Sequence, residues 1–276
     1  MSAYTSTPHG GPTGQRLAAL ILRERGLTLL GLIFLAATLP TLFAMAVDER
    51  MIGGVSVWAK PFKFQFSGGL HLVTVALAML AVAPQARAGR LARVGVAAVA
   101  ISTAFEVLYI SLQGARGLPS HFAASALGQA MYGLMGLAAT ALVLGTAALA
   151  IPVLTRPAPG VPDALRYGLG LGLLVSGVFG LASGWAISLS HGPIVGVATG
   201  SGLPLFGWSR TAGDLRVGHF IALHAAQGLP LLGLLLRDRA PAFARTALIA
   251  AAALWSALAL GAMLHALAGI PAFPMP

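Results

Sequence analysis

Seven apolar runs, separated by polar connectors, decide what this chain can fold into. Each run is long enough, at a rise of about 1.5 Å per residue, to cross the hydrocarbon core of a bilayer as an α-helix. Backbone polar groups find no water in that core, so helices that satisfy their own hydrogen bonds are favoured. We therefore predict an all-α integral membrane bundle of seven transmembrane helices. The predicted spans are 26–47, 61–82, 91–112, 124–154, 167–190, 217–236 and 246–268.

The composition agrees with this prediction and excludes several classes of protein. Hydrophobic residues make up 57% of the 276 residues and charged residues 9%, which is outside the range of ordinary soluble domains. The chain has no cysteine, so disulfides, thiolate metal ligands and cysteine nucleophiles are excluded. The net charge of +10 comes from basic residues scattered among the connectors. We therefore expect a lipid bilayer as the partner, and no nucleic acid.

The N-terminal segment differs from the rest of the chain. Residues 1–26 are polar and rich in Gly, Pro, Ser and Thr, which predicts a disordered cytoplasmic tail ahead of a transmembrane domain at 27–276. A cleavable signal peptide is the alternative, because Ala44 and Ala46 resemble a cleavage site. The apolar stretch exceeds the usual signal core of about 7 to 15 residues, which favours a retained helix. Whether residues 27–46 act partly as a signal anchor is left open.

The distribution of basic residues predicts the orientation of the bundle, because positively charged connectors stay on the cytoplasmic side. With a cytoplasmic N-terminus, 11 of the 17 basic residues fall on the inner side. The six on the outer side are Arg50, Lys60, Lys63, Arg116, Arg210 and Arg216. We therefore predict a cytoplasmic N-terminus and a periplasmic C-terminus.

Three ionisable residues fall at one depth in three different predicted spans. His71, Glu106 and His224 each lie roughly 12 to 15 Å below the outer surface of the bilayer. Ionisable groups at this depth are costly and are by default a functional hypothesis. We predict that they build a polar site together with Tyr132 and Gln227, in which Glu106 and Tyr132 are the candidate catalytic groups.

Helical periodicity predicts that these residues face a common interior. At 100° per residue, the second and third spans each carry one polar stripe. The stripes are Lys60, Lys63, Ser67, His71 and Thr74, and Ser102, Glu106, Tyr109 and Gln113. Hydrogen bonding between helices is the simpler interpretation of the Ser, Thr and Gln residues. For Glu106 a site is the better interpretation, because a carboxylate inside a bilayer needs a cation, a metal or a proton.

The segment 214–227 is unusually polar for the start of a membrane span. Its His219 and His224 differ by about 140° in helical phase, so they are poor joint ligands for one ion. We expect His224 in the polar layer and His219 with Arg216 at the rim above it. An interval of eight residues also recurs at the start of three inward-running spans, which suggests related hairpins. It separates Lys63 from His71, His121 from Gln129, and His219 from Gln227.

Two cofactor hypotheses follow from the polar layer. His71, Glu106 and His224 form a two-histidine, one-carboxylate set that suits a single Zn or Fe ion. Alternatively, His71 and His224 are the axial ligands of a haem b, with a quinone as a candidate partner. Cations at the outer rim suit haem propionates or a small anionic substrate. They are Lys60, Lys63, Arg116 and Arg216.

A small-solute or proton-coupled carrier without a cofactor is the alternative, since Glu106 and the histidines can exchange protons. A structural or interaction protein is the third hypothesis. The sequence has no Gly-x-Ser-x-Gly elbow, Walker loop or dinucleotide-binding loop. Residues with a predicted secondary role are His121, His219, Gln129, Gln227, Asp214, His191 and His265.

Three segments resemble those of a group of bacterial multi-pass membrane proteins with no assigned activity. They are 58–64, 116–122 and 213–220, and His224 and Gln227 follow the last of them. The resemblance implies a bacterial inner (cytoplasmic) membrane and no particular reaction. Seven-helix zinc hydrolases of the ceramidase and adiponectin-receptor type share the helix count and the buried histidines. Their His-x-x-x-His pair is absent from this sequence.

Overall fold

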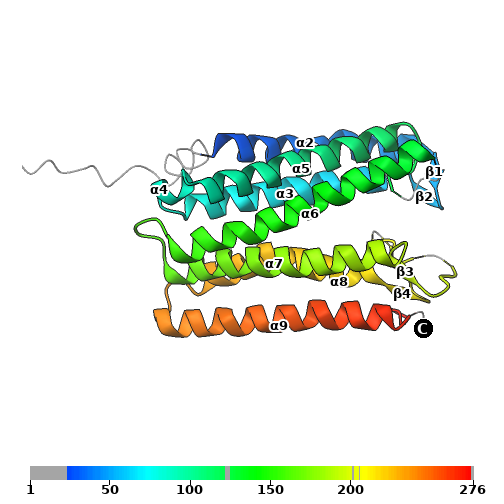
Figure 1. The fold of residues 1–276 in the computed structure, drawn as a ribbon. Coiled ribbons are helices and arrows are strands. Elements are labelled where there is room, and N and C mark those ends of the chain that lie inside the picture. Colours follow the sequence, from blue (N-terminus) through cyan, green and yellow to red (C-terminus); the bar gives the residue numbers. More distant parts are fainter. Residues whose placement is uncertain (1–23, 122–124, 201, 205, 275–276) are drawn as a thin grey trace, which may run out of the picture.

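Seven long helices run side by side along the molecule (Figure 1). The computed structural model describes residues 24–121, 125–200, 202–204 and 206–274. The long helices are α2 (Arg25–Val47), α3 (Ala59–Leu80), α5 (Arg90–Ala115), α6 (Ala126–Thr155), α7 (Asp163–Leu189), α8 (Leu215–Leu235) and α9 (Pro241–Leu267). All seven are long and apolar enough to cross a membrane. The predicted bundle is therefore confirmed, and the bounds of each span agree with those of its helix to within five residues. Most of the predicted tail, 1–26, lies outside the described residues.

Short elements mark the two ends of the bundle. Strands β1 (Met51–Ile52) and β2 (Val55–Ser56) form a hairpin between α2 and α3, and β3 (Ile194–Val195) pairs with β4 (Gly213–Asp214) just before α8. All four strands lie at the end where α9 finishes, which we call the strand end (Figure 1). The one-turn helix α4 (Pro84–Arg87) lies at the opposite end, which we call the α4 end.

The helices form two groups that α6 joins. Helices α2, α3 and α5 pack together, α7, α8 and α9 pack together, and α6 packs against both α5 and α7 (Figure 1). The larger apolar core lies between α3, α5 and α6 and is built around Leu72, Met79, Val99 and Leu149. Burial of such side chains stabilises the first group.

Glycines let α7 and α8 approach closely. A Cβ added at Gly168 or at Gly172 would lie 2.7 Å from a backbone carbonyl oxygen of α8, that of Leu229 or Ala225. Helices in membranes pack closely where small residues face each other, because lipid provides little hydrophobic driving force between them. These contacts fix the position of α8, which carries two of the histidines discussed below.

The outside of the bundle is apolar, as a bilayer requires. Leu39, Ile101 and Leu137 are each about 70% exposed, at 69%, 70% and 71%. Exposed leucines and isoleucines on long helices match a hydrocarbon surrounding rather than water. The chain is therefore an integral multi-pass membrane protein.

Candidate functional site

Three histidines, carried by α3 and α8, are linked electrostatically through His224. His71 lies in the middle of α3, and His219 and His224 lie in the first half of α8. His224 interacts electrostatically with both of the others. We call His219, His224 and His71 the histidine row. The ring of His224 also stacks on Phe220, with 3.9 Å between the ring centroids.

Hydrogen bonds determine which nitrogen of each imidazole carries the proton. His224 Nδ1 lies 2.8 Å from the carbonyl oxygen of Phe220, so this nitrogen carries the proton and donates. His71 Nε2 lies 2.9 Å from the Thr146 hydroxyl on α6. That hydroxyl already donates to the carbonyl oxygen of Leu142, so the imidazole donates to it.

The same argument assigns the protonated nitrogen of His219. Its Nδ1 lies 2.8 Å from the Ser183 hydroxyl on α7, and Ser183 already donates to the carbonyl oxygen of Phe179. His219 Nδ1 is therefore the donor. Each neutral histidine of the row then has a second nitrogen with an available lone pair. Within the described part of the chain, no hydrogen bond reaches His71 Nδ1, His219 Nε2 or His224 Nε2.

A second polar cluster lies closer to the strand end. Lys60, in the first turn of α3, donates to His121 Nδ1 at 3.0 Å and attracts Glu106 of α5 electrostatically. Glu106 is buried, and among the described residues its Oε1 atom has no hydrogen-bond partner. We call Lys60, Glu106 and His121 the Lys60 cluster. It supplies the cation that a carboxylate needs inside a membrane.

His121 lies in the connector between α5 and α6, outside the membrane spans. Burial, together with the nearby Lys60 charge, lowers its pKa to about 3. The imidazole is therefore neutral at pH 7, and its Nδ1 accepts a hydrogen bond from the Lys60 ammonium. The His121 ring also contacts Tyr132 of α6 edge to face, with 5.6 Å between centroids.

The polar face of α3 connects the two clusters. Lys63 donates to the carbonyl oxygen of Phe206 at 2.9 Å, and Thr74 accepts a hydrogen bond from Gln227 of α8 at 3.1 Å. Ser67 lies between Lys63 and His71 on this face and is exposed. Side chains on one face of α3 therefore reach α5, α6, α8 and the loop before α8.

The predicted rim cations make contacts within the protein. Arg216 forms an ion pair with Asp214, which caps α8, and also donates to the carbonyl oxygen of Gly207. Arg116 donates to Gln113 at 3.2 Å. Asp214 is buried, so the pair with Arg216 anchors the loop between α7 and α8.

The other residues predicted from the sequence lie at several places in the bundle. His191 and His265 are exposed at the ends of α7 and α9, and Gln129 is exposed on α6. Tyr132 contacts the His121 ring of the Lys60 cluster, and its hydroxyl bonds Ser188 of α7. Glu106 interacts with Lys60, whereas His71 and His224 interact with each other. Among the described residues, no group of three or more His, Asp or Glu side chains could hold a metal ion. The three-ligand set of His71, Glu106 and His224 stays a prediction.

Sequence reasoning missed Thr146 and Phe220. Both contact the histidine row, but nothing in the apolar run of α6 distinguishes Thr146 from Thr140 or Thr155, which also bond a carbonyl oxygen four residues earlier. Only the packing of α6 against α3 brings Thr146 to His71.

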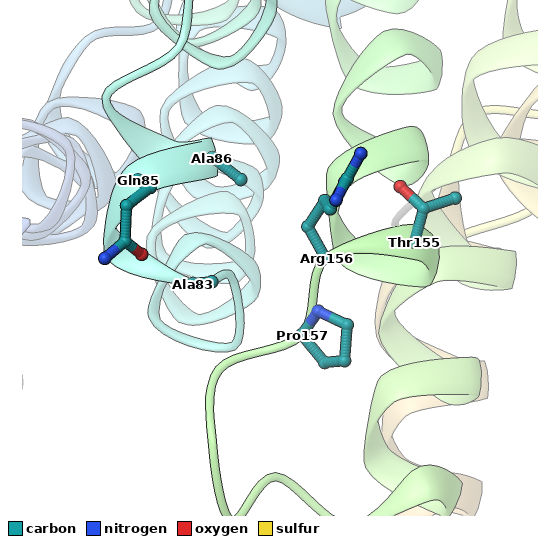
Figure 2. A pocket seen from close by; sticks show the side chains of 6 residues that line it. All are labelled: Ala83, Gln85, Ala86, Thr155, Arg156 and Pro157. Atoms are coloured by element: carbon teal, nitrogen blue, oxygen red, sulfur yellow. The ribbon is translucent and has the colours of Figure 1, made fainter.

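Two cavities lie outside these clusters. One of about 530 Å³ lies at the α4 end, between α4 and the end of α6 (Figure 2). Figure 2 shows the Gln85 side chain directed away from those of Arg156 and Thr155, so the polar side chains that line this cavity do not converge. The other, of about 270 Å³, lies at the strand end between α5 and α6.

Comparison with known proteins identifies no relative of this chain. No family model matches the chain, and neither a curated protein nor a solved structure matches it. The resemblance to bacterial inner-membrane proteins therefore stays a prediction.

Proposed function

We propose that this membrane protein is a proton-coupled carrier of a small anionic solute, in which the histidine row exchanges the protons. The observation that carries the proposal is the available nitrogen on each of three imidazoles that are linked electrostatically through His224. An imidazole that takes a proton on this nitrogen becomes a cation without losing its existing hydrogen bond. Histidine changes charge near neutral pH more readily than other side chains do.

Coupling within the row supports transfer rather than storage of protons. His224 interacts electrostatically with His71 and with His219. A proton on one imidazole therefore disfavours a second proton on its neighbour. A proton-coupled carrier requires groups that hold one proton at a time and pass it on, here between α8 and α3.

Charge at the strand end supports an anionic solute. Lys63 lies beside the loop at Phe206, and the exposed Ser67 hydroxyl follows one turn later on the same face of α3. We place the anion beside Ser67, because Lys63 precedes it and His71 follows it by one turn on the same face of α3. Charge-assisted hydrogen bonds from such groups favour carboxylate, phosphate or sulfate oxygens.

Flux measurements test this proposal. The purified protein is reconstituted into liposomes that contain a pH-sensitive dye, and inward gradients of succinate, phosphate and sulfate are applied in turn. With at least one of the three anions, we expect the interior of the liposomes to acidify faster than that of protein-free liposomes. His71→Ala and His224→Ala reduce the rate to that of protein-free liposomes, because each removes one step of the row. His265→Ala, on the exposed end of α9, is the matched control and keeps the rate.

Two outcomes contradict the proposal, the first by rejecting the carrier and the second by rejecting the role of the histidine row. The first is a rate with all three anions that equals that of protein-free liposomes. The second is an unchanged rate in the His71→Ala and His224→Ala variants, which would show that protons bypass the row. Size-exclusion profiles of the variants confirm that they remain folded.

A haem b or a single metal ion at His71 and His224 is the second candidate. His224 Nδ1 donates to a backbone carbonyl oxygen, and ligating histidines commonly hold their other nitrogen in this way. Its Nε2 is thus available as a ligand, and His71, on α3, would supply the second imidazole. Haem would supply one-electron chemistry, with a membrane quinone as the candidate partner.

An absorption spectrum and a metal analysis test the cofactor. A Soret band that disappears in His224→Ala supports haem, and stoichiometric metal without this band supports an ion. Protein purified from the membrane with neither a Soret band nor stoichiometric metal rejects both. We further propose a bacterial inner membrane with the strand end in the periplasm, as the basic residues indicate.

A further inference from the structure

We infer that the strand-end cavity between α5 and α6 binds an amphiphilic anion, which is an anionic oxygen head on an apolar chain. The cavity measures about 270 Å³ and combines polar and apolar walls. The inference does not depend on the carrier, because the cavity includes no member of the histidine row or of the Lys60 cluster.

The polar wall contains Arg116, which is exposed and bonds the buried side chain of Gln113. Arg116 donates to Gln113 Oε1 at 3.2 Å, and the amide nitrogen of Gln113 in turn contacts the carbonyl oxygen of Pro119. Gln113 is buried. A guanidinium has five N–H donors, so one such bond leaves most of them available. Within the described chain Arg116 forms no ion pair.

Tyr109 and Ser125, which each carry a hydroxyl group, also line the cavity, and the Ser125 oxygen accepts a hydrogen bond from the Gly128 amide. Arginine binds carboxylate and phosphate oxygens through two parallel N–H donors, and a nearby hydroxyl adds a further donor. The polar wall therefore fits a single anionic head group.

The apolar wall favours an attached hydrocarbon chain. Leu118, Leu127 and Met131 line the cavity together with Pro119 and Gly128. Leu118 and Leu127 are 41% and 74% exposed on the surface of the bundle. A chain that leaves the cavity over these leucines continues into the surrounding lipid. A cavity of this size holds a head group and a few methylenes, since it equals about nine water volumes of roughly 30 Å³ each.

Both a fatty-acid carboxylate and a lipid phosphate have this chemistry. Photocrosslinking with decanoic acid that carries a diazirine on its chain tests the site. The full-length protein is placed in nanodiscs of phosphatidylcholine, which has no net charge. We expect crosslinks to concentrate in peptides that contain residues 109–131. Arg116→Gln lowers this labelling about tenfold, as the loss of one charge-assisted contact predicts. Arg210→Gln, at the same end but outside the cavity, leaves it unchanged.

A second variant separates filling of the cavity from loss of charge. Met131→Trp keeps Arg116 and occupies the apolar wall, so it also lowers the labelling. Competition then identifies the source of the anion. Unlabelled decanoate that competes better than phosphatidylglycerol indicates a carboxylate ligand, and the reverse indicates a lipid phosphate. Three results overturn the inference: labelling that Arg116→Gln does not change, labelling spread evenly over the helices, or inorganic phosphate that competes as well as either amphiphile.

Discussion

His71 on α3 and Thr146 on α6 are joined by a hydrogen bond of 2.9 Å between Nε2 and Oγ1, although 75 positions separate them in the chain. The Thr146 hydroxyl donates its own hydrogen bond to the backbone carbonyl oxygen of Leu142 in the same helix. The bond therefore places the His71 proton on Nε2 and leaves Nδ1 as an acceptor. It also links α3 to α6 beside the histidine row.

Thr146→Val tests this link. The variant removes the only acceptor that the described chain offers to His71 Nε2, and a buried donor without a partner costs about 1 to 3 kcal/mol. We expect a lower unfolding temperature in detergent. Thr155→Val is the control, because the exposed Thr155 hydroxyl bonds only within α6. Equal unfolding temperatures of the two variants would contradict the assigned role of Thr146.

Gly172→Ala tests the close packing of α7 and α8. The added methyl group would lie 2.7 Å from the carbonyl oxygen of Ala225, and overpacking of this kind costs about 1 to 3 kcal/mol. Gly133→Ala places the same methyl group on α6 with nothing within 4 Å, where helix propensity favours alanine. Thermal unfolding of both variants is the measurement. A Gly172→Ala protein as stable as Gly133→Ala would show that α7 and α8 can separate at no cost.

The pH dependence of stability tests the environment of His121. Burial and the Lys60 charge lower its pKa from 6.5 to about 3. The unfolded chain binds a proton at His121 below pH 6.5 and the folded chain does not, so the folded state loses stability as the pH falls from about 6.5 towards 3. His121→Asn does not titrate in this window and can still accept a hydrogen bond from Lys60.

The unfolding temperature of wild type and of His121→Asn, measured every half pH unit, checks this prediction. As the pH falls, we expect the unfolding temperature of the wild type to decrease relative to that of His121→Asn. A constant difference across the window would mean that His121 is hydrated and has an ordinary pKa.

The orientation is testable because the chain has no cysteine. Val55→Cys places one thiol in the exposed β1–β2 hairpin, and Ala88→Cys places one thiol after α4 at the opposite end. With the strand end in the periplasm, a membrane-impermeant maleimide labels Val55→Cys in intact cells and labels Ala88→Cys only after lysis. The reverse pattern would invert the proposed orientation.

The site was only partly predictable from the sequence. The depths of His71 and His224 follow from counting residues along a helix, because the rise per residue is constant. Their partners do not follow, because a contact depends on how each helix is rotated against its neighbours. Glu106 illustrates this. The sequence suggested that it shares a layer with His71 and His224, whereas its electrostatic partner is Lys60. Lys60 lies about three turns closer to the strand end than His71 does on α3.

The sequence alone determined the seven helices, since an apolar run of sufficient length satisfies its own backbone hydrogen bonds wherever it lies in the bilayer. This is a local property, and the seven long helices, α2, α3 and α5 to α9, keep it with little change in their boundaries. Only the tertiary structure decided that α8 lies against Gly168 and Gly172 of α7 and that α6 brings Thr146 to His71. Close packing of small residues sets these rotations, and it depends on both surfaces at once.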